Sequence, residues 1–157
     1  MLIHKYLIVK LIVLIKNIIF SIIVKEMIAK KNDFDIKIDF PYTSLITINV
    51  NWEYPIRALE CFKYGFIPSQ MEDKYLVFYE NDYLQYYGFI DSKPCYGARL
   101  KITEESVFID EIGQVINEYI KENNYEINEL HVKSLVISYI ESILYENGFS
   151  WEENSEE

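Results

Sequence analysis

The chain is poor in the residues from which catalytic and metal sites are usually built. Its 157 residues include two histidines, His4 and His131, and five scattered glycines. Neither a glycine-rich phosphate loop nor a G-x-S-x-G nucleophile motif occurs. His131 lies beside an apolar helical stripe, with no cysteine or second histidine at ligand spacing, which favours a helix-surface residue. The sequence therefore predicts no catalytic residues, no metal site and no cofactor.

Cysteine is equally scarce. Cys61 and Cys95 are the two in the chain, and neither belongs to a C-x-x-C motif. They are too few and too far apart for a disulfide framework, so we expect buried free thiols in a reducing cytoplasm. An activated thiol would need a nearby cation, for which Arg99 is the one local candidate.

A net positive charge occurs only at the beginning of the chain. The formal net charge is −10, and residues 1–31 carry six lysines against Glu26, a net of +5, which leaves −15 on residues 32–157. A surface this acidic repels the phosphates of nucleic acids. We therefore expect a basic protein partner and no direct binding of nucleic acid.

The length and the apolar content bound the domain organisation. Half of the residues are hydrophobic, which suffices for one core, while the chain is too short for two comfortable domains. We predict an apolar, basic N-terminal segment at residues 1–31 and a single acidic domain at residues 32–157.

The N-terminal segment leaves three alternatives open. Residues 7–24 read LIVKLIVLIKNIIFSIIV, in which Lys10, Lys16 and Asn17 interrupt the apolar run. On membrane-insertion scales, the favourable free energy of the apolar residues and the unfavourable free energy of the lysines nearly cancel. The small-residue cleavage site of a secretory signal peptide does not follow the apolar run. The segment is a membrane anchor, a helix that lies at a membrane interface or docks on a protein, or a leader before a start at Met27. Either membrane alternative would attach a cytoplasmic protein to the inner face of the membrane.

Alternating apolar and polar residues predict the strands. A hairpin is expected from residues 36–40 and 46–52, and a short helix from residue 56 to Gly65 follows Pro55. The clearest hairpin spans residues 74–87, with its turn at Asn81 and Asp82. Further strands are expected at residues 95–102 and 106–109.

The last third of the chain changes to a helical period. Ile112, Val115, Ile116, Tyr119 and Ile120 predict a helix with Asp110 as its N-cap, ending at Asn123. A second helix is expected from Asn128 to Gly148, and its apolar stripe consists of Val132, Leu135, Val136, Tyr139, Ile140, Ile143 and Leu144. Strands followed by helices indicate an α+β domain, an antiparallel β-meander of about five strands packed on two C-terminal helices.

Residues 68–87, PSQMEDKYLVFYENDYLQYY, combine five tyrosines with acidic residues. Large side chains occupy both faces of this hairpin, although one apolar face is enough for a sheet that helices cover on one side. The tyrosines are either ordinary cross-strand pairs or contacts for a partner. Tyr79, Tyr83 and Tyr86 are the candidate partner-binding residues, and Tyr83, next to the turn, is the favoured anchor.

The same stretch resembles the central hairpin of a group of small uncharacterised bacterial proteins with an EDKWFxY and LYFHRSWTG pattern. Tyr75 stands where that pattern has tryptophan, and residues 87–92 read YGFIDS in place of HRSWTG. The matching residues are Glu72, Asp73, Lys74, Tyr79, Glu80, Leu84 and Tyr86. The resemblance covers about twenty residues and implies the hairpin, without an activity.

Acidic residues dominate the C-terminal helices. Residues 110–157 carry twelve acids against Lys121 and Lys133, which is either a solvated face or a docking face for a basic protein. Glu118, Glu122 and Glu129 are the candidate partner-binding acids. The sequence thus predicts a small acidic protein-binding module that neutralises or regulates a basic partner, such as an immunity-type protein or a phage-type inhibitor of a nucleic-acid enzyme.

Two alternatives belong to other classes. One is a membrane-tethered accessory protein that uses residues 7–24. The other is a carboxylate-dependent hydrolase, because two carboxylates at suitable separation can act on a sugar. Its candidate acids are Glu72, Asp73, Glu80, Asp82, Asp91, Glu104 and Glu105.

Overall fold

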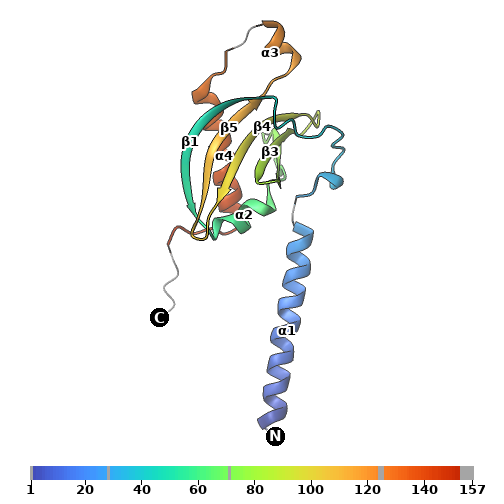
Figure 1. The fold of residues 1–157 in the computed structure, drawn as a ribbon. Helices are drawn as coiled ribbons and strands as arrows, with labels where there is room; N and C mark the ends of the chain where they lie inside the picture. Colours follow the sequence, from blue (N-terminus) through green and yellow to red (C-terminus); the bar gives the residue numbers. More distant parts are fainter. Residues whose placement is uncertain (1, 28, 71, 124–125, 153–157) are drawn as a thin grey trace.

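The computed structural model describes residues 2–27, 29–70, 72–123 and 126–152. It has the expected α+β class, with one five-stranded antiparallel sheet in the order β1-β5-β4-β3-β2 (Figure 1). In chain order the elements are α1 (Leu2–Met27), η1 (Lys31–Asp33), β1 (Leu45–Pro55), α2 (Ala58–Tyr64), β2 (Tyr75–Glu80), β3 (Tyr83–Gly88), β4 (Pro94–Ile102), β5 (Ser106–Val115), α3 (Glu118–Asn123) and α4 (Glu129–Glu146).

The hairpin of β2 and β3 confirms the strongest prediction from the sequence. Its two central turn residues, Asn81 and Asp82, have φ angles of 52° and 57°. Both angles are the left-handed values that a type I′ turn requires, and Asn and Asp tolerate them best among residues with a side chain. The turn pairs Glu80 directly with Tyr83. Local sequence therefore sets both the turn and the register.

The predicted hairpin of residues 36–40 and 46–52 is wrong in its first half. Residues 46–52 lie in β1, but residues 36–40 form an irregular segment that crosses the sheet. The Tyr87 hydroxyl donates to the Ile38 carbonyl at 3.2 Å, and a Cβ on Gly97 would lie 2.7 Å from the Phe40 ring. This segment covers the sheet because the apolar residues of β2 and β3 on that face need burial.

The helix predicted from Asp110 to Asn123 is also wrong over its first half. Strand β5 continues to Val115, and only Glu118–Asn123 is helical. Asp110 is skipped in the pairing with β4, where Leu100 faces Ile109 and Arg99 faces Glu111. This β-bulge puts Ile109 and Ile112 into the same core although they are three positions apart. A spacing of three residues between buried positions is also the spacing of a helical apolar stripe, which explains the wrong prediction.

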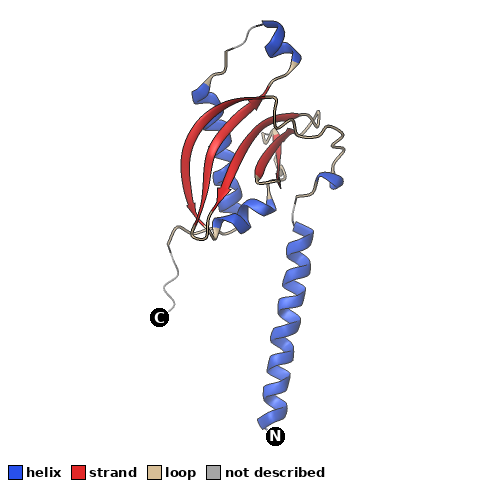
Figure 2. Cartoon of the chain, viewed as in Figure 1, coloured by secondary structure: helices blue, strands red, loops and turns tan. Residues whose placement is uncertain are grey.

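Helix α4 confirms the second predicted helix. The Asn128 side chain accepts a hydrogen bond from the His131 backbone N–H at 3.0 Å, which caps the start of the helix. The buried side of the helix consists of Val132, Val136, Ile140, Ile143 and Leu144. Figure 2 shows α4 behind the sheet, and α2 contacts α4, β1 and β2. The helical layer is therefore α4 with α2, rather than two C-terminal helices.

Two hydrophobic clusters lie on opposite faces of the sheet. The larger cluster joins the sheet to α2 and α4 and includes Phe62, Tyr86 and Ile140. The smaller cluster contains Phe78 and Tyr87, which the residues after η1 cover. Alternation along β3 puts the neighbours Tyr86 and Tyr87 into different clusters.

Helix α1 extends away from the rest of the structure (Figures 1 and 2). Each described side chain from Ile3 to Ile19 is exposed. Among the residues that the structure describes, no helix is long and apolar enough to cross a membrane.

Candidate functional site

The structure disperses the tyrosines that the sequence proposes as a partner surface. Tyr86 is fully buried, and its hydroxyl donates to the Val136 carbonyl of α4 at 2.9 Å. Tyr79 and Tyr83 are half-buried, and they lie on opposite faces of the hairpin, because Tyr79 packs on the larger cluster and Tyr83 on the smaller one. Tyr86 is therefore withdrawn as an accessible contact, and the three tyrosines do not form one surface.

Each half-buried tyrosine has a neighbour within the chain. The Tyr79 hydroxyl donates to an Asp82 carboxylate oxygen at 2.9 Å, and burial together with this carboxylate raises its pKa to about 12. The Tyr83 ring packs on those of Phe40 and Tyr42, at centroid distances of 6.0 and 5.0 Å. Tyr83, the favoured anchor, thus belongs to an aromatic cluster that covers the sheet.

The predicted acids lie away from these tyrosines. Glu122 and Glu129 are exposed on α3 and at the start of α4. The Glu118 side chain lies outside the described part of the structure. The hairpin turn is beside Leu100, whose partner on β5 is Ile109, whereas α3 follows the opposite end of β5. The acids and the tyrosines do not form one site.

A cavity at the other end of α4 combines aromatic and acidic residues. It has a volume of about 540 Å³ between β1, α4 and the residues that follow α4. Its lining consists of Trp52, Glu53, Tyr54, Ile137, Glu141, Leu144, Tyr145, Phe149 and Trp151. We call it the aromatic cavity. Both charged residues in this lining are acids.

The rings in the aromatic cavity support one another. The Trp151 ring lies 5.7 Å from that of Tyr54 and 5.2 Å from that of Phe149, measured between centroids. Tyr54 is buried, whereas Trp151 is 64% and Tyr145 is 86% exposed. Large aromatic side chains exposed around a hollow are typical of binding sites.

Electrostatics make this cavity suitable for a cation. Burial, and then the nearby Glu141 carboxylate, raise the pKa of Tyr54 to about 12. Glu53 keeps its position through a hydrogen bond from the Ser106 hydroxyl at 2.8 Å. The C-terminal end of α4 adds the negative pole of a helix dipole, and the last turn of α4 contains no basic residue to neutralise it.

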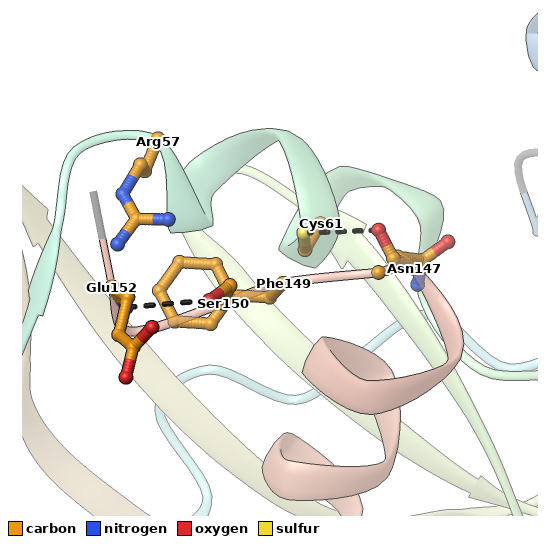
Figure 3. A pocket seen from close by; sticks show the side chains of 7 residues that line it. Arg57, Cys61, Asn147, Phe149, Ser150 and Glu152 are labelled. Atoms are coloured by element: carbon orange, nitrogen blue, oxygen red, sulfur yellow. Dashed lines mark hydrogen bonds between the residues drawn. The ribbon is translucent and has the colours of Figure 1, made fainter. Parts of the chain in front are cut away.

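A second cavity, of about 520 Å³, shares Phe149 with the first (Figure 3). Arg57 lies over the Phe149 ring, with its guanidinium carbon 4.6 Å from the centroid. Cys61 donates its thiol proton to the Asn147 carbonyl at 3.9 Å. The ring that lines both cavities therefore already binds one cation of this chain.

Sequence reasoning missed the aromatic cavity because its residues come from distant positions. Trp52 lies in the alternating run that predicts a strand at residues 46–52, and Trp151 lies in the acidic end of the chain. A signal was present, since the apolar residues Phe149 and Trp151 stand between Gly148 and the acidic residues that begin at Glu152. Only the approach of β1 to the end of α4 brings the two tryptophans together.

The carboxylates of the hydrolase alternative are mostly exposed and dispersed. Two of them, Asp73 and Asp91, line a smaller cavity of about 370 Å³ together with Cys95. An Asp91 carboxylate oxygen accepts a hydrogen bond from the Lys93 backbone N–H at 3.1 Å. Asp91 therefore stabilises the turn between β3 and β4.

The two thiols are free, and their surroundings disfavour the thiolate form. Burial raises the pKa of Cys61, and burial together with the Asp91 carboxylate raises that of Cys95 to about 11. Arg99, the one local candidate for an activating cation, makes a two-point ion pair with Asp110 at 2.9 and 3.0 Å. Within the described residues, no cluster of three or more histidines, cysteines or acids could hold a metal ion.

Comparisons with protein-family models, curated proteins and solved structures found no match. The resemblance of residues 68–87 to small bacterial proteins stays a prediction, although the hairpin that it implied is present.

Proposed function

We propose that this chain is a small acidic module that binds a basic partner protein and neutralises or regulates it, as an immunity-type protein or a phage-type enzyme inhibitor does. The observation that carries the proposal is the aromatic cavity, in which aromatic rings and two carboxylates surround one hollow. The partner would insert a lysine or arginine side chain there.

The chemistry of the lining favours a cation. A lysine or arginine over an aromatic face gains about 0.5 to 2 kcal/mol, and tryptophan is the strongest partner. Glu53 and Glu141, which are both exposed, supply opposite charge beside the rings. Aromatic residues with a polar rim are also the usual composition of interface centres.

The rest of the domain supports the same kind of partner. Residues 32–157 carry a net charge of −15, which accelerates the encounter with a basic protein. Glu122 and Glu129 contribute to this long-range field from the far end of α4. The two free thiols suit a reducing cytoplasm, where we place the module, and any attachment to the inner face of the membrane would depend on α1.

The test uses the chain's own fluorescence. Trp52 and Trp151 are its two tryptophans, and both line the aromatic cavity. Titration with an oligolysine peptide should change the tryptophan emission saturably, whereas an oligoserine peptide of equal length should not. The double variant Glu53→Gln/Glu141→Gln should weaken oligolysine binding about fivefold, because the two exposed carboxylates together contribute roughly 1 kcal/mol through their ion pairs.

A matched variant separates the cavity from the general charge of the domain. Glu122→Gln/Glu129→Gln removes the same charge at the other end of α4 and should weaken binding less than threefold, because distant exposed charges are screened by salt. Equal losses in the two double variants, or unchanged emission on binding, would overturn the cavity as the site.

A further inference from the structure

Helix α1 carries a large apolar surface that nothing in the described structure covers. Its apolar side chains from Ile3 to Ile19 are between 46 and 73% exposed. Monomeric proteins rarely leave contiguous apolar surface of this kind in water. The surface needs an occupant, and the domain does not provide one, because α1 extends away from the sheet and its helices (Figure 1).

The helix has two different sides. At 3.6 residues per turn, one half of the circumference between Ile3 and Ile19 is apolar apart from His4. This apolar side consists of Ile3, Leu7, Ile8, Leu11, Ile12, Leu14, Ile15, Ile18 and Ile19. The lysine side consists of Lys5, Tyr6, Val9, Lys10, Val13, Lys16 and Asn17. On it the Lys10 ammonium lies 4.8 Å from the centre of the Tyr6 ring.

These two sides match the surface of a lipid bilayer. A helix at an interface buries its apolar side below the headgroups, and its lysines stay at the level of the phosphates. A second copy of α1 would cover a narrower stripe than the apolar half offers. The three lysines also give the helix the charge opposite to that of anionic lipids.

We infer that α1 attaches this chain to the surface of anionic phospholipid bilayers and lies in the headgroup layer with its apolar side toward the acyl chains. The acidic domain is repelled by the same surface and stays in water. This inference does not depend on the aromatic cavity, so each can fail without the other.

Flotation of the full chain with lipid vesicles tests the attachment. Vesicles of equimolar phosphatidylcholine and phosphatidylglycerol should carry the chain upward, and vesicles of phosphatidylcholine alone should carry much less. The triple variant Lys5→Glu/Lys10→Glu/Lys16→Glu should bind at least about 100-fold more weakly, because each lysine near an anionic surface contributes roughly fivefold.

A matched triple variant controls for total charge. Lys37→Glu/Lys74→Glu/Lys93→Glu makes the same change at exposed lysines of the domain and should retain binding within about threefold, since these charges lie outside α1. Glu53→Gln/Glu141→Gln should also leave vesicle binding unchanged. Each variant should melt like the parent chain.

The orientation of α1 has its own readout. Ile15→Trp adds a tryptophan to the apolar side, and Val13→Trp adds one to the lysine side. Phospholipids brominated in their acyl chains should quench the tryptophan at position 15 strongly and that at position 13 weakly. Equal quenching at both positions would show a helix immersed on all sides and would overturn the surface orientation.

Three further results would overturn the attachment itself. They are no flotation with either kind of vesicle, equal binding to the two kinds, and equal losses in the two triple variants. Self-association without lipid that Leu11→Glu abolishes, together with no flotation, would assign the apolar side to a second copy.

Discussion

Neighbouring tyrosines in β3 have separate roles. The Tyr86 hydroxyl reaches the Val136 carbonyl of α4, and the Tyr87 hydroxyl reaches the Ile38 carbonyl on the other face of the sheet. Each ring is fully buried and ends in a hydrogen bond to backbone. A tyrosine in these positions therefore joins the sheet to the layer that covers it.

Truncating Tyr86 should be among the most damaging single changes. We expect Tyr86→Ala to lower the free energy of unfolding by about 3 to 5 kcal/mol, because it leaves a large cavity. Tyr86→Phe removes only the hydrogen bond to Val136 and should cost about 1 kcal/mol. Tyr83→Ala should cost less than Tyr86→Ala, since Tyr83 is half-buried. Urea denaturation measures all three, and equal losses for Tyr83→Ala and Tyr86→Ala would contradict this ranking.

Buried tyrosines should also set the alkaline limit of stability. Burial raises the pKa of Tyr54 from 10.0 to about 12, so the folded state holds this proton more tightly than the unfolded state. This difference in the pKa of Tyr54 stabilises the folded state fully below pH 10, and the stabilisation is lost as the pH rises from 10 toward 12. Tyrosinate absorbance during an alkaline titration should rise together with unfolding, and Tyr54→Phe should make the loss less steep. Full ionisation of the tyrosines in a folded chain would contradict this expectation.

At the scale of elements, the junction after α1 is attached to the domain. The Ala29 N–H donates to the Tyr64 carbonyl at 2.9 Å, and the Ala29 side chain is buried. Lys31 forms an ion pair with Glu80 and lies 5.2 Å from the Tyr87 ring centre. The domain therefore begins in the structure at about Ala29, slightly before the predicted boundary at residue 32.

Two shortened chains should show whether the domain begins at about Ala29 or at residue 32. A chain that starts at Met27 should melt cooperatively, because the strands, α2 and α4 all follow it. A chain that starts at Asn32 loses the contacts of Ala29 and Lys31, and its free energy of unfolding should be about 1 to 2 kcal/mol lower. Calorimetry measures both. Loss of the cooperative melt in the Met27 chain would mean that residues 7–24 belong to the core.

At the scale of the whole molecule, charge is separated along the chain. The segment 1–31 has a net charge of +5 and the remainder −15, and α1 points away from the domain (Figure 1). Partners of opposite charge are therefore expected at the two ends of the molecule: an anionic surface for α1 and a cationic protein for the domain.

This separation predicts different kinetic effects for different acids. Association with an oligolysine peptide should slow as the salt concentration approaches physiological strength, where the screening length is roughly 8 Å. Charge reversal at Glu118, Glu122 and Glu129 should lower the association rate, whereas Glu141→Gln should mainly raise the dissociation rate. Stopped-flow measurements of tryptophan emission give the association rate and the dissociation rate separately. An association rate that is independent of salt would exclude steering by these acids.

Local chemistry in the sequence was sufficient for two elements of this protein. The Asn81 and Asp82 turn sets the β2–β3 hairpin, and the 3.6-residue period with its Asn128 cap sets α4, because each depends on residues close in the chain. Tertiary structure decided β5, where pairing with β1 and β4 and the bulge at Asp110 overrode an apparent helical period. It also decided the aromatic cavity, since Trp52 and Trp151 meet only when β1 packs beside α4. Contacts between distant residues leave no spacing pattern in the chain, so they emerge only from the packed fold.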